Sequence, residues 1–169
     1  MANIPGAART GVSTETGLLD SWPENGPKLL WQAKGAGNGY SSPAVVAGRV
    51  YTMGDHDGGE FISCFDGNSG KLVWEKQIGD AWNGHARNPT WNGSRATPTI
   101  DGDRVYAIHA TGTLICLSTA DGKINWQKSM KDDFGGKKAD SWGYGESPTV
   151  DGPLLLCTPG GTKSTVAAG

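Results

Sequence analysis

The sequence predicts an all-β fold made of repeated four-stranded antiparallel units, and three observations predict it. A pattern that begins with Ser-Pro or Thr-Pro starts at residues 42, 97 and 147. Its spacing of about 50 residues is typical of repeat architectures. A second pattern, Gly-Lys-x-x-Trp, follows the first two copies and ends at Trp74 and Trp126. The apolar runs are short, show no helical periodicity and are separated by Gly, Asp, Asn and Pro.

In the first unit we expect four strands joined by hairpins, over residues 43–47, 49–53, 60–65 and 71–77. Pro43 begins the first strand, where a missing N–H costs little. Gly48 allows a tight first turn. Residues 55–59 are predicted as a loop and residues 66–70 as the last turn, because Asp, Gly, Asn and Ser gather there. The result is a four-stranded meander.

A four-stranded meander cannot bury both faces of its sheet alone, whereas radial stacking in a β-propeller lets each sheet cover the next. The tryptophan that ends each unit lies on the outermost strand, where a buried indole supplies apolar area and one N–H donor. A glycine four residues earlier offers a positive-φ turn position and a flat surface for the ring. The residues predicted to dock neighbouring units are Asp66, Gly70, Trp74, Gly122 and Trp126.

The chain divides into an N-terminal extension, residues 1–24, and part of a propeller, residues 25–169. Residues 25–34 mimic an outermost strand and are expected to close the ring from the N-terminal side. They are followed by two whole units and part of a third, at residues 40–80, 95–130 and 145–169. A propeller typically needs four to eight blades. The sequence therefore predicts an incomplete ring that belongs to a longer protein.

Composition excludes several functions. The chain has 15 Lys and Arg against 17 Asp and Glu, a net charge of -2, which argues against a general nucleic-acid partner. No apolar run has the length of a transmembrane helix. The start shows no signal peptide pattern, which leaves a cytoplasmic protein or a start that is not the natural one. The sparse cysteines, Cys64, Cys116 and Cys157, predict small buried side chains and no disulfide framework.

Candidate binding residues lie in the connections that lead into the first strand of each unit and in the loops between second and third strands. In a propeller these segments share the face where the central channel opens, and loops on a rigid scaffold often carry binding residues. The candidates for a small ligand at the channel mouth are Tyr40, His56, Arg95, His109, Tyr144 and Glu146.

Two other groups have simpler interpretations. Asp55, Asp57 and Glu60 lack the spacing of a calcium-binding EF-hand loop, so we interpret them as a solvated hairpin loop. Three loop aromatics, Trp82, Trp91 and Trp142, either bind a sugar or polymer or pack over neighbouring units, and packing is the expectation for at least two of them.

The two patterns together resemble the pyrroloquinoline-quinone-like (PQQ-like) repeat with its tryptophan-docking motif. The resemblance runs from about residue 17 to residue 169, and residues 11–19 resemble the start of exported bacterial proteins of this family. The docking motif is complete in the first unit. In the second unit Ser118 stands where Asp is usual, and Asp121 stands where Thr or Ser is usual.

The resemblance implies one of two functional classes. Quinoprotein alcohol and sugar dehydrogenases bind PQQ and calcium, whereas other members carry no cofactor and include a scaffold lipoprotein of outer-membrane assembly. The sequence has no Cys-Cys pair and no clustered Glu, Asn and Asp set of the dehydrogenase kind. We therefore expect no catalytic residue, no metal site and a scaffold or binding role, with a fragment of a PQQ-dependent dehydrogenase as the alternative.

Location and partners also follow from the resemblance. It implies a periplasmic or exported protein of a bacterial envelope. The implied partners are the remaining blades of the same propeller, other envelope proteins, or a small ligand at the channel mouth.

Overall fold

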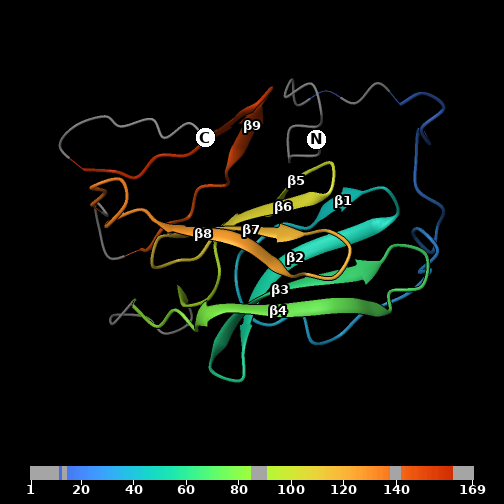
Figure 1. Ribbon diagram of the computed structural model, residues 1–169. Helices are drawn as coiled ribbons and strands as arrows, with labels where there is room; N and C mark the ends of the chain where they lie inside the picture. Colours follow the sequence, from blue (N-terminus) through green and yellow to red (C-terminus); the bar gives the residue numbers. More distant parts are fainter. Residues whose placement is uncertain (1–11, 13–14, 85–90, 138–141, 162–169) are drawn as a thin grey trace.

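The computed structural model describes residues 12, 15–84, 91–137 and 142–161. These residues form three antiparallel sheets and contain no α-helix (Figure 1). Unit 1 consists of β1 (Ala44–Val46), β2 (Arg49–His56), β3 (Gly59–Asp66) and β4 (Leu72–Asp80). Unit 2 consists of β5 (Thr99–Asp101), β6 (Arg104–Ile108), β7 (Thr113–Ser118) and β8 (Ile124–Ser129). Unit 3 has β9 (Thr149–Asp151) and β10 (Leu154–Leu156).

Each of the first two units is a four-stranded meander, with its strands hydrogen-bonded in chain order. This confirms the predicted all-β fold of antiparallel four-stranded blades. The described residues do not close a ring, and the expected third strand of unit 3 lies outside them. In Figure 1 the sheet β1–β4 lies against the sheet β5–β8.

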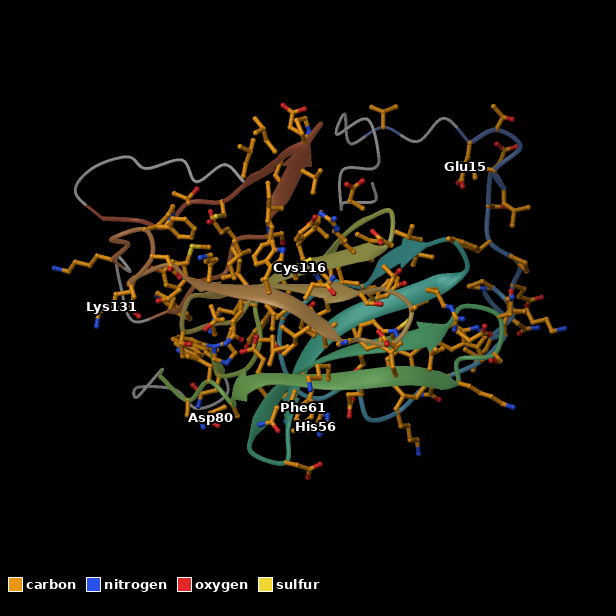
Figure 2. The ribbon with its side chains drawn as sticks, in the orientation of Figure 1. Glu15, His56, Phe61, Asp80, Cys116 and Lys131 are labelled. Atoms are coloured by element: carbon orange, nitrogen blue, oxygen red, sulfur yellow. The ribbon has the colours of Figure 1, made fainter. Side chains whose placement is uncertain are left out.

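One apolar core joins the units. Ile62 and Cys64 of β3 and Val105, Ile115 and Leu117 of unit 2 are each completely buried in it. All three cysteines are buried and unpaired, as predicted, and Figure 2 shows Cys116 inside the molecule, on β7. Four consecutive apolar residues of β7, Leu114 to Leu117, are buried. Since successive side chains of a strand point to opposite faces, both faces of the unit 2 sheet are covered there.

The turn between β2 and β3 is tighter than predicted. The expected loop 55–59 is wrong: only Asp57 and Gly58 lie outside the strands. Both have positive φ, 48° and 80°, which is the conformation of a two-residue type I′ hairpin turn. The Asp-Gly pair is a strong signal for this two-residue turn, whereas the acidic residues around it indicated a longer loop.

The residues that begin each repeat form equivalent hydrogen bonds from one unit to the next. The Ser42 N–H donates to Thr97 Oγ1 at 3.2 Å, and the Thr97 N–H donates to Ser147 Oγ at 2.9 Å. A hydroxyl can accept such a bond, which gives a reason for Thr at position 97 and Ser at position 147.

Tryptophans on the outer side make a second set of repeated contacts. Trp74 Nε1 donates to the Thr119 carbonyl of unit 2 at 2.9 Å, and a Cβ at Gly122 would lie 2.5 Å from the Trp74 ring. Trp31 relates in the same way to unit 1, where Nε1 donates to the Gly67 carbonyl at 2.8 Å and the ring covers Gly70. Each indole thus joins the last turn of the following unit.

The segment around Trp31 is not a strand. Residues 25–34 form no strand pairing with any described residue. A β-strand requires a hydrogen-bonded neighbour, so this segment does not count as one. The contacts of Trp31 nevertheless fix where the segment lies. Its role in closing a ring stays a prediction, as do the predicted domain limits.

Gly122→Ala is expected to destabilise the chain more than Gly102→Ala does. Both glycines have positive φ, 70° and 57°, but a Cβ at Gly102 meets nothing within 4 Å. Each substitution costs about 1–2 kcal/mol for the left-handed backbone, and overpacking against Trp74 adds about 1–3 kcal/mol at Gly122. Urea unfolding followed by circular dichroism measures the difference. Equal losses of unfolding free energy in the two variants would show that the contact with the Trp74 indole does not contribute to stability.

Candidate functional site

The carboxylates Asp55 and Glu60 are buried side by side at one end of unit 1. They occupy paired positions of β2 and β3 and are 7% and 0% exposed. The interpretation of Asp55, Asp57 and Glu60 as a solvated loop is therefore wrong for the first and third of these residues. Only Asp57, at the turn, extends into solvent. Asp55 and Glu60 lie on the sheet face that meets unit 2, whereas Asp57 lies in the turn outside the two strands.

Asp55 connects three segments of the chain. Its Oδ2 accepts the Trp82 N–H at 2.8 Å and its Oδ1 accepts the Ser94 hydroxyl at 3.1 Å. Its backbone exchanges two hydrogen bonds with Asn38, at 2.8 and 2.9 Å. Burial raises the pKa of Asp55, and the bonds from Trp82 and Ser94 oppose that rise. Through its backbone Asp55 holds the segment before β1, and through its carboxylate it holds the segments after β4 and before β5.

Glu60 faces unit 2, and few hydrogen bonds compensate for the burial of its carboxyl group. Its Oε2 lies 3.4 Å from His109 Nε2 and 3.4 Å from the Ala110 N–H. Its Oε1 is buried and has no hydrogen-bond partner among the described residues. Burial first, and the nearby Asp55 second, raise the pKa of Glu60 to about 8. The side chain is therefore protonated at neutral pH.

His109 follows β6, and its ring forms hydrogen bonds with backbone groups of both unit 1 and unit 2. Its Nδ1 accepts the Thr111 N–H at 3.1 Å, and its Nε2 lies 2.9 Å from the Asp80 carbonyl. A carbonyl can only accept, which places the proton on Nε2. His109 is 3% exposed. The imidazole therefore joins the end of β4 in unit 1 to the β6–β7 turn of unit 2.

Arg95 lies among aromatic rings just before β5. Its guanidinium carbon is 5.3 Å from the ring centre of Tyr40, 4.9 Å from that of Trp82 and 5.1 Å from that of Trp142. These distances are within the range of cation–π attraction. Its guanidinium also donates to the Trp91 carbonyl. Arg95 thus holds aromatic residues from four loop segments in one cluster.

The six predicted channel-mouth residues do not form one site. Tyr40 and Arg95 are in contact. Tyr144 is buried against Gly112 and donates its hydroxyl to the Pro159 carbonyl at 2.9 Å, and Glu146 accepts the Thr158 N–H. His109 lies between the units as described above.

His56 occupies a different sheet face. It stacks on Phe61, with ring centres 4.0 Å apart, and its Nε2 is 3.3 Å from Glu75. Figure 2 labels His56 and Phe61, which lie close together. The hydrogen bond between His56 and Asp57 is the first cause of a raised pKa at this imidazole. His56 is thus anchored within unit 1 and does not approach His109.

The three loop tryptophans differ in exposure. Trp82 is 4% exposed, whereas Trp91 and Trp142 are 41% and 39% exposed. The two exposed rings contact one another, with centres 5.1 Å apart. Position in a loop does not reveal which of the three tryptophans is buried, because Trp82 is covered by residues distant in the sequence, Arg95 and Gly143.

A cavity of about 770 Å³ opens at the same end of unit 1. Its wall consists mainly of asparagine, glycine and acidic residues, with one tyrosine. The lining residues are Asn38, Gly39, Tyr40, Asp55, His56, Asp57, Gly58, Ala81, Asn83, Asn92 and Gly93. Sequence reasoning found Tyr40 and His56 but missed the three asparagines, because single asparagines in turns are common and carry no signal of their own.

The described residues do not assemble a calcium site. Calcium takes six to eight oxygen ligands. Across residues 12, 15–84, 91–137 and 142–161, no three His, Cys, Asp or Glu side chains are placed to hold a metal ion. Both oxygens of the Asp55 carboxylate already accept hydrogen bonds. PQQ and calcium therefore rest on family resemblance alone.

The described part of the chain also contains no helix long and apolar enough to cross a membrane. Its strands, turns and inter-unit contacts define a partial β-propeller. The profile of a protein family described as outer membrane protein assembly factor BamB matches residues 58–168. This range is more than half of the chain, and the chain belongs to this family of PQQ-like β-propeller proteins.

Solved structures share the fold. The crystal structure of BamB from Moraxella catarrhalis is 19% identical over 82% of this chain and 33% of its own, with a TM-score of 0.51. A europium-containing methanol dehydrogenase is 17% identical over 76% of this chain and 22% of its own, with a TM-score of 0.57.

Quinohemoprotein alcohol dehydrogenase from Comamonas testosteroni is 18% identical over 72% of this chain and 17% of its own, with a TM-score of 0.53. No curated protein matches the chain. The chain spans a third or less of the length of these solved structures.

Proposed function

We propose that this chain is a non-catalytic part of a PQQ-like propeller that serves as a scaffold or binding module in the bacterial envelope. One observation carries the proposal: polar side chains at the loop end are engaged in holding backbone. Tyr144 and Glu146 bind the backbone of Pro159 and Thr158, and His109 binds that of Asp80. A catalytic group must instead reach a substrate. A rigid rim of this kind suits a protein that presents surfaces to partners.

The remaining blades of the same propeller are the first partners we propose. Trp74 is 8% exposed where it covers the turn of unit 2, whereas Trp126, at the corresponding position of unit 2, is 36% exposed. We propose that Trp126 docks on the equivalent turn of the next unit, in the way that Trp74 docks on Gly122. Other envelope proteins would then bind the assembled propeller.

Reconstitution with PQQ and calcium tests the proposal. The complete protein that contains this chain is incubated with both, and the quinone absorbance band and dye-linked alcohol oxidation are measured. We expect neither a bound quinone nor activity, with the protein recovered in the periplasmic or membrane fraction of the cell. A quinone band together with alcohol oxidation would establish the alternative, a quinoprotein dehydrogenase.

A further inference from the structure

The cavity at the loop end of unit 1 has the size and accessibility of a small-ligand site. Its volume of about 770 Å³ falls within the range of roughly 300–1,000 Å³ found for ligand pockets. Its wall comes from four segments: the residues before β1, the β2–β3 turn, the residues after β4 and the residues before β5. Asp55 holds these segments together through Asn38, Trp82 and Ser94, so the wall is pre-organised.

The chemistry of the wall suits a hydroxyl-rich ligand that carries no negative charge. Asn38, Asn83 and Asn92 each carry an amide with both a donor and an acceptor, which suits hydroxyl groups that also donate and accept. Among the described residues that line the cavity there is no Lys or Arg, and Ala81 is the one aliphatic side chain. His56 lines the cavity but lies against the carboxylates of Asp57 and Glu75, and Asp55 and Asp57 are acidic. We therefore expect phosphates and carboxylates to be disfavoured, and lipids meet no extended apolar wall.

Aromatic rings continue from the rim of the cavity. Tyr40 lines the cavity and is 54% exposed, and Arg95 links it to Trp142, whose ring contacts Trp91. Trp91 and Trp142 are both substantially exposed. A neighbouring group of exposed aromatic side chains marks an interaction surface. The faces of aromatic rings carry partial negative charge and attract the weakly positive C–H groups of a sugar ring.

We propose that this cavity and the adjoining aromatic cluster, Tyr40, Trp91 and Trp142, bind a neutral oligosaccharide. One sugar unit occupies the cavity, where the asparagine amides bind its hydroxyls, and the next units stack on the aromatic cluster. Trp82 has no direct contact with the sugar, because it is buried beneath Arg95. This binding proposal does not depend on the proposed scaffold role, so either proposal can be wrong while the other holds.

Isothermal titration calorimetry of the full chain with maltohexaose, cellohexaose and chitohexaose tests this site, with hexagalacturonate as an anionic control. We expect at least one neutral hexamer to bind and hexagalacturonate to bind at least tenfold more weakly. Tyr40→Ala and Trp142→Ala are each expected to weaken the neutral hexamer at least tenfold. Trp22→Ala, at an indole 71% exposed but outside the site, should leave binding unchanged.

Asn92→Ala probes the cavity separately from the aromatic cluster. It should weaken the hexamer and its disaccharide in the same proportion, because only the unit in the cavity contacts this amide. Circular dichroism spectra establish that each variant is folded. Absence of binding by all three neutral hexamers, preference for the anionic hexamer, or binding that persists in Tyr40→Ala and Trp142→Ala would overturn the proposal.

Discussion

Replacing Trp74 by alanine is expected to lower the free energy of unfolding by about 3–5 kcal/mol, the range for a buried tryptophan. The side chain is 8% exposed and covers Gly122, with its indole N–H donating to the Thr119 carbonyl. The substitution removes this contact between units 1 and 2 and leaves a cavity at the edge of the core. Urea unfolding monitored by circular dichroism measures the loss.

Trp126→Ala is the matched control, because Trp126 has the same position in unit 2. Its side chain is 36% exposed, so the substitution is expected to cost less than half as much in this chain. Trp74→Phe separates the two components of the contact, since it keeps most of the apolar area and loses the hydrogen bond. A loss in Trp126→Ala as large as that in Trp74→Ala would contradict the assignment of Trp74 as an inter-unit contact.

Stability is expected to fall as the pH rises from about 5 to about 8, and Glu60 is the main cause. The pKa of its buried carboxyl is raised from 4.5 to about 8, so over this range the folded chain retains a proton that the unfolded chain has released. Unfolding then releases a proton, and a higher pH favours it. Each pKa unit corresponds to about 1.4 kcal/mol, which makes the total a few kcal/mol.

Glu60→Gln is expected to flatten this pH dependence and to make the chain more stable than the parent at pH 8. The amide keeps the size and the acceptor oxygen of the side chain but cannot ionise. The pKa of Asp66 is instead lowered by hydrogen bonds from Ser69 and Asn68. Asp66→Asn should therefore destabilise the chain near neutral pH and reduce its loss of stability in acid. Unfolding midpoints between pH 4 and 9 measure both effects, and an unchanged profile in Glu60→Gln would refute the assignment to Glu60.

The candidate site was predictable only in part. Tyr40 and Arg95 both precede the first strands of their units, and the structure brings them into contact. The partners of Glu60 could not be predicted, because His109 and Ala110 belong to another unit about 50 residues away in the repeat. The asparagines of the cavity come from three separate segments, so no local pattern joins them.

The repeated pattern by itself determined the strand order, the number of strands in a unit and the position of the outer tryptophans. It could do so because alternation, turn residues and repeat spacing are local properties of the chain. Only the tertiary structure decided which polar groups are buried. Asp55 and Asp57 stand two residues apart, yet one is enclosed between units and the other lies in solvent. Burial depends on what the neighbouring sheet places over a residue, and the sequence around that residue does not contain this information.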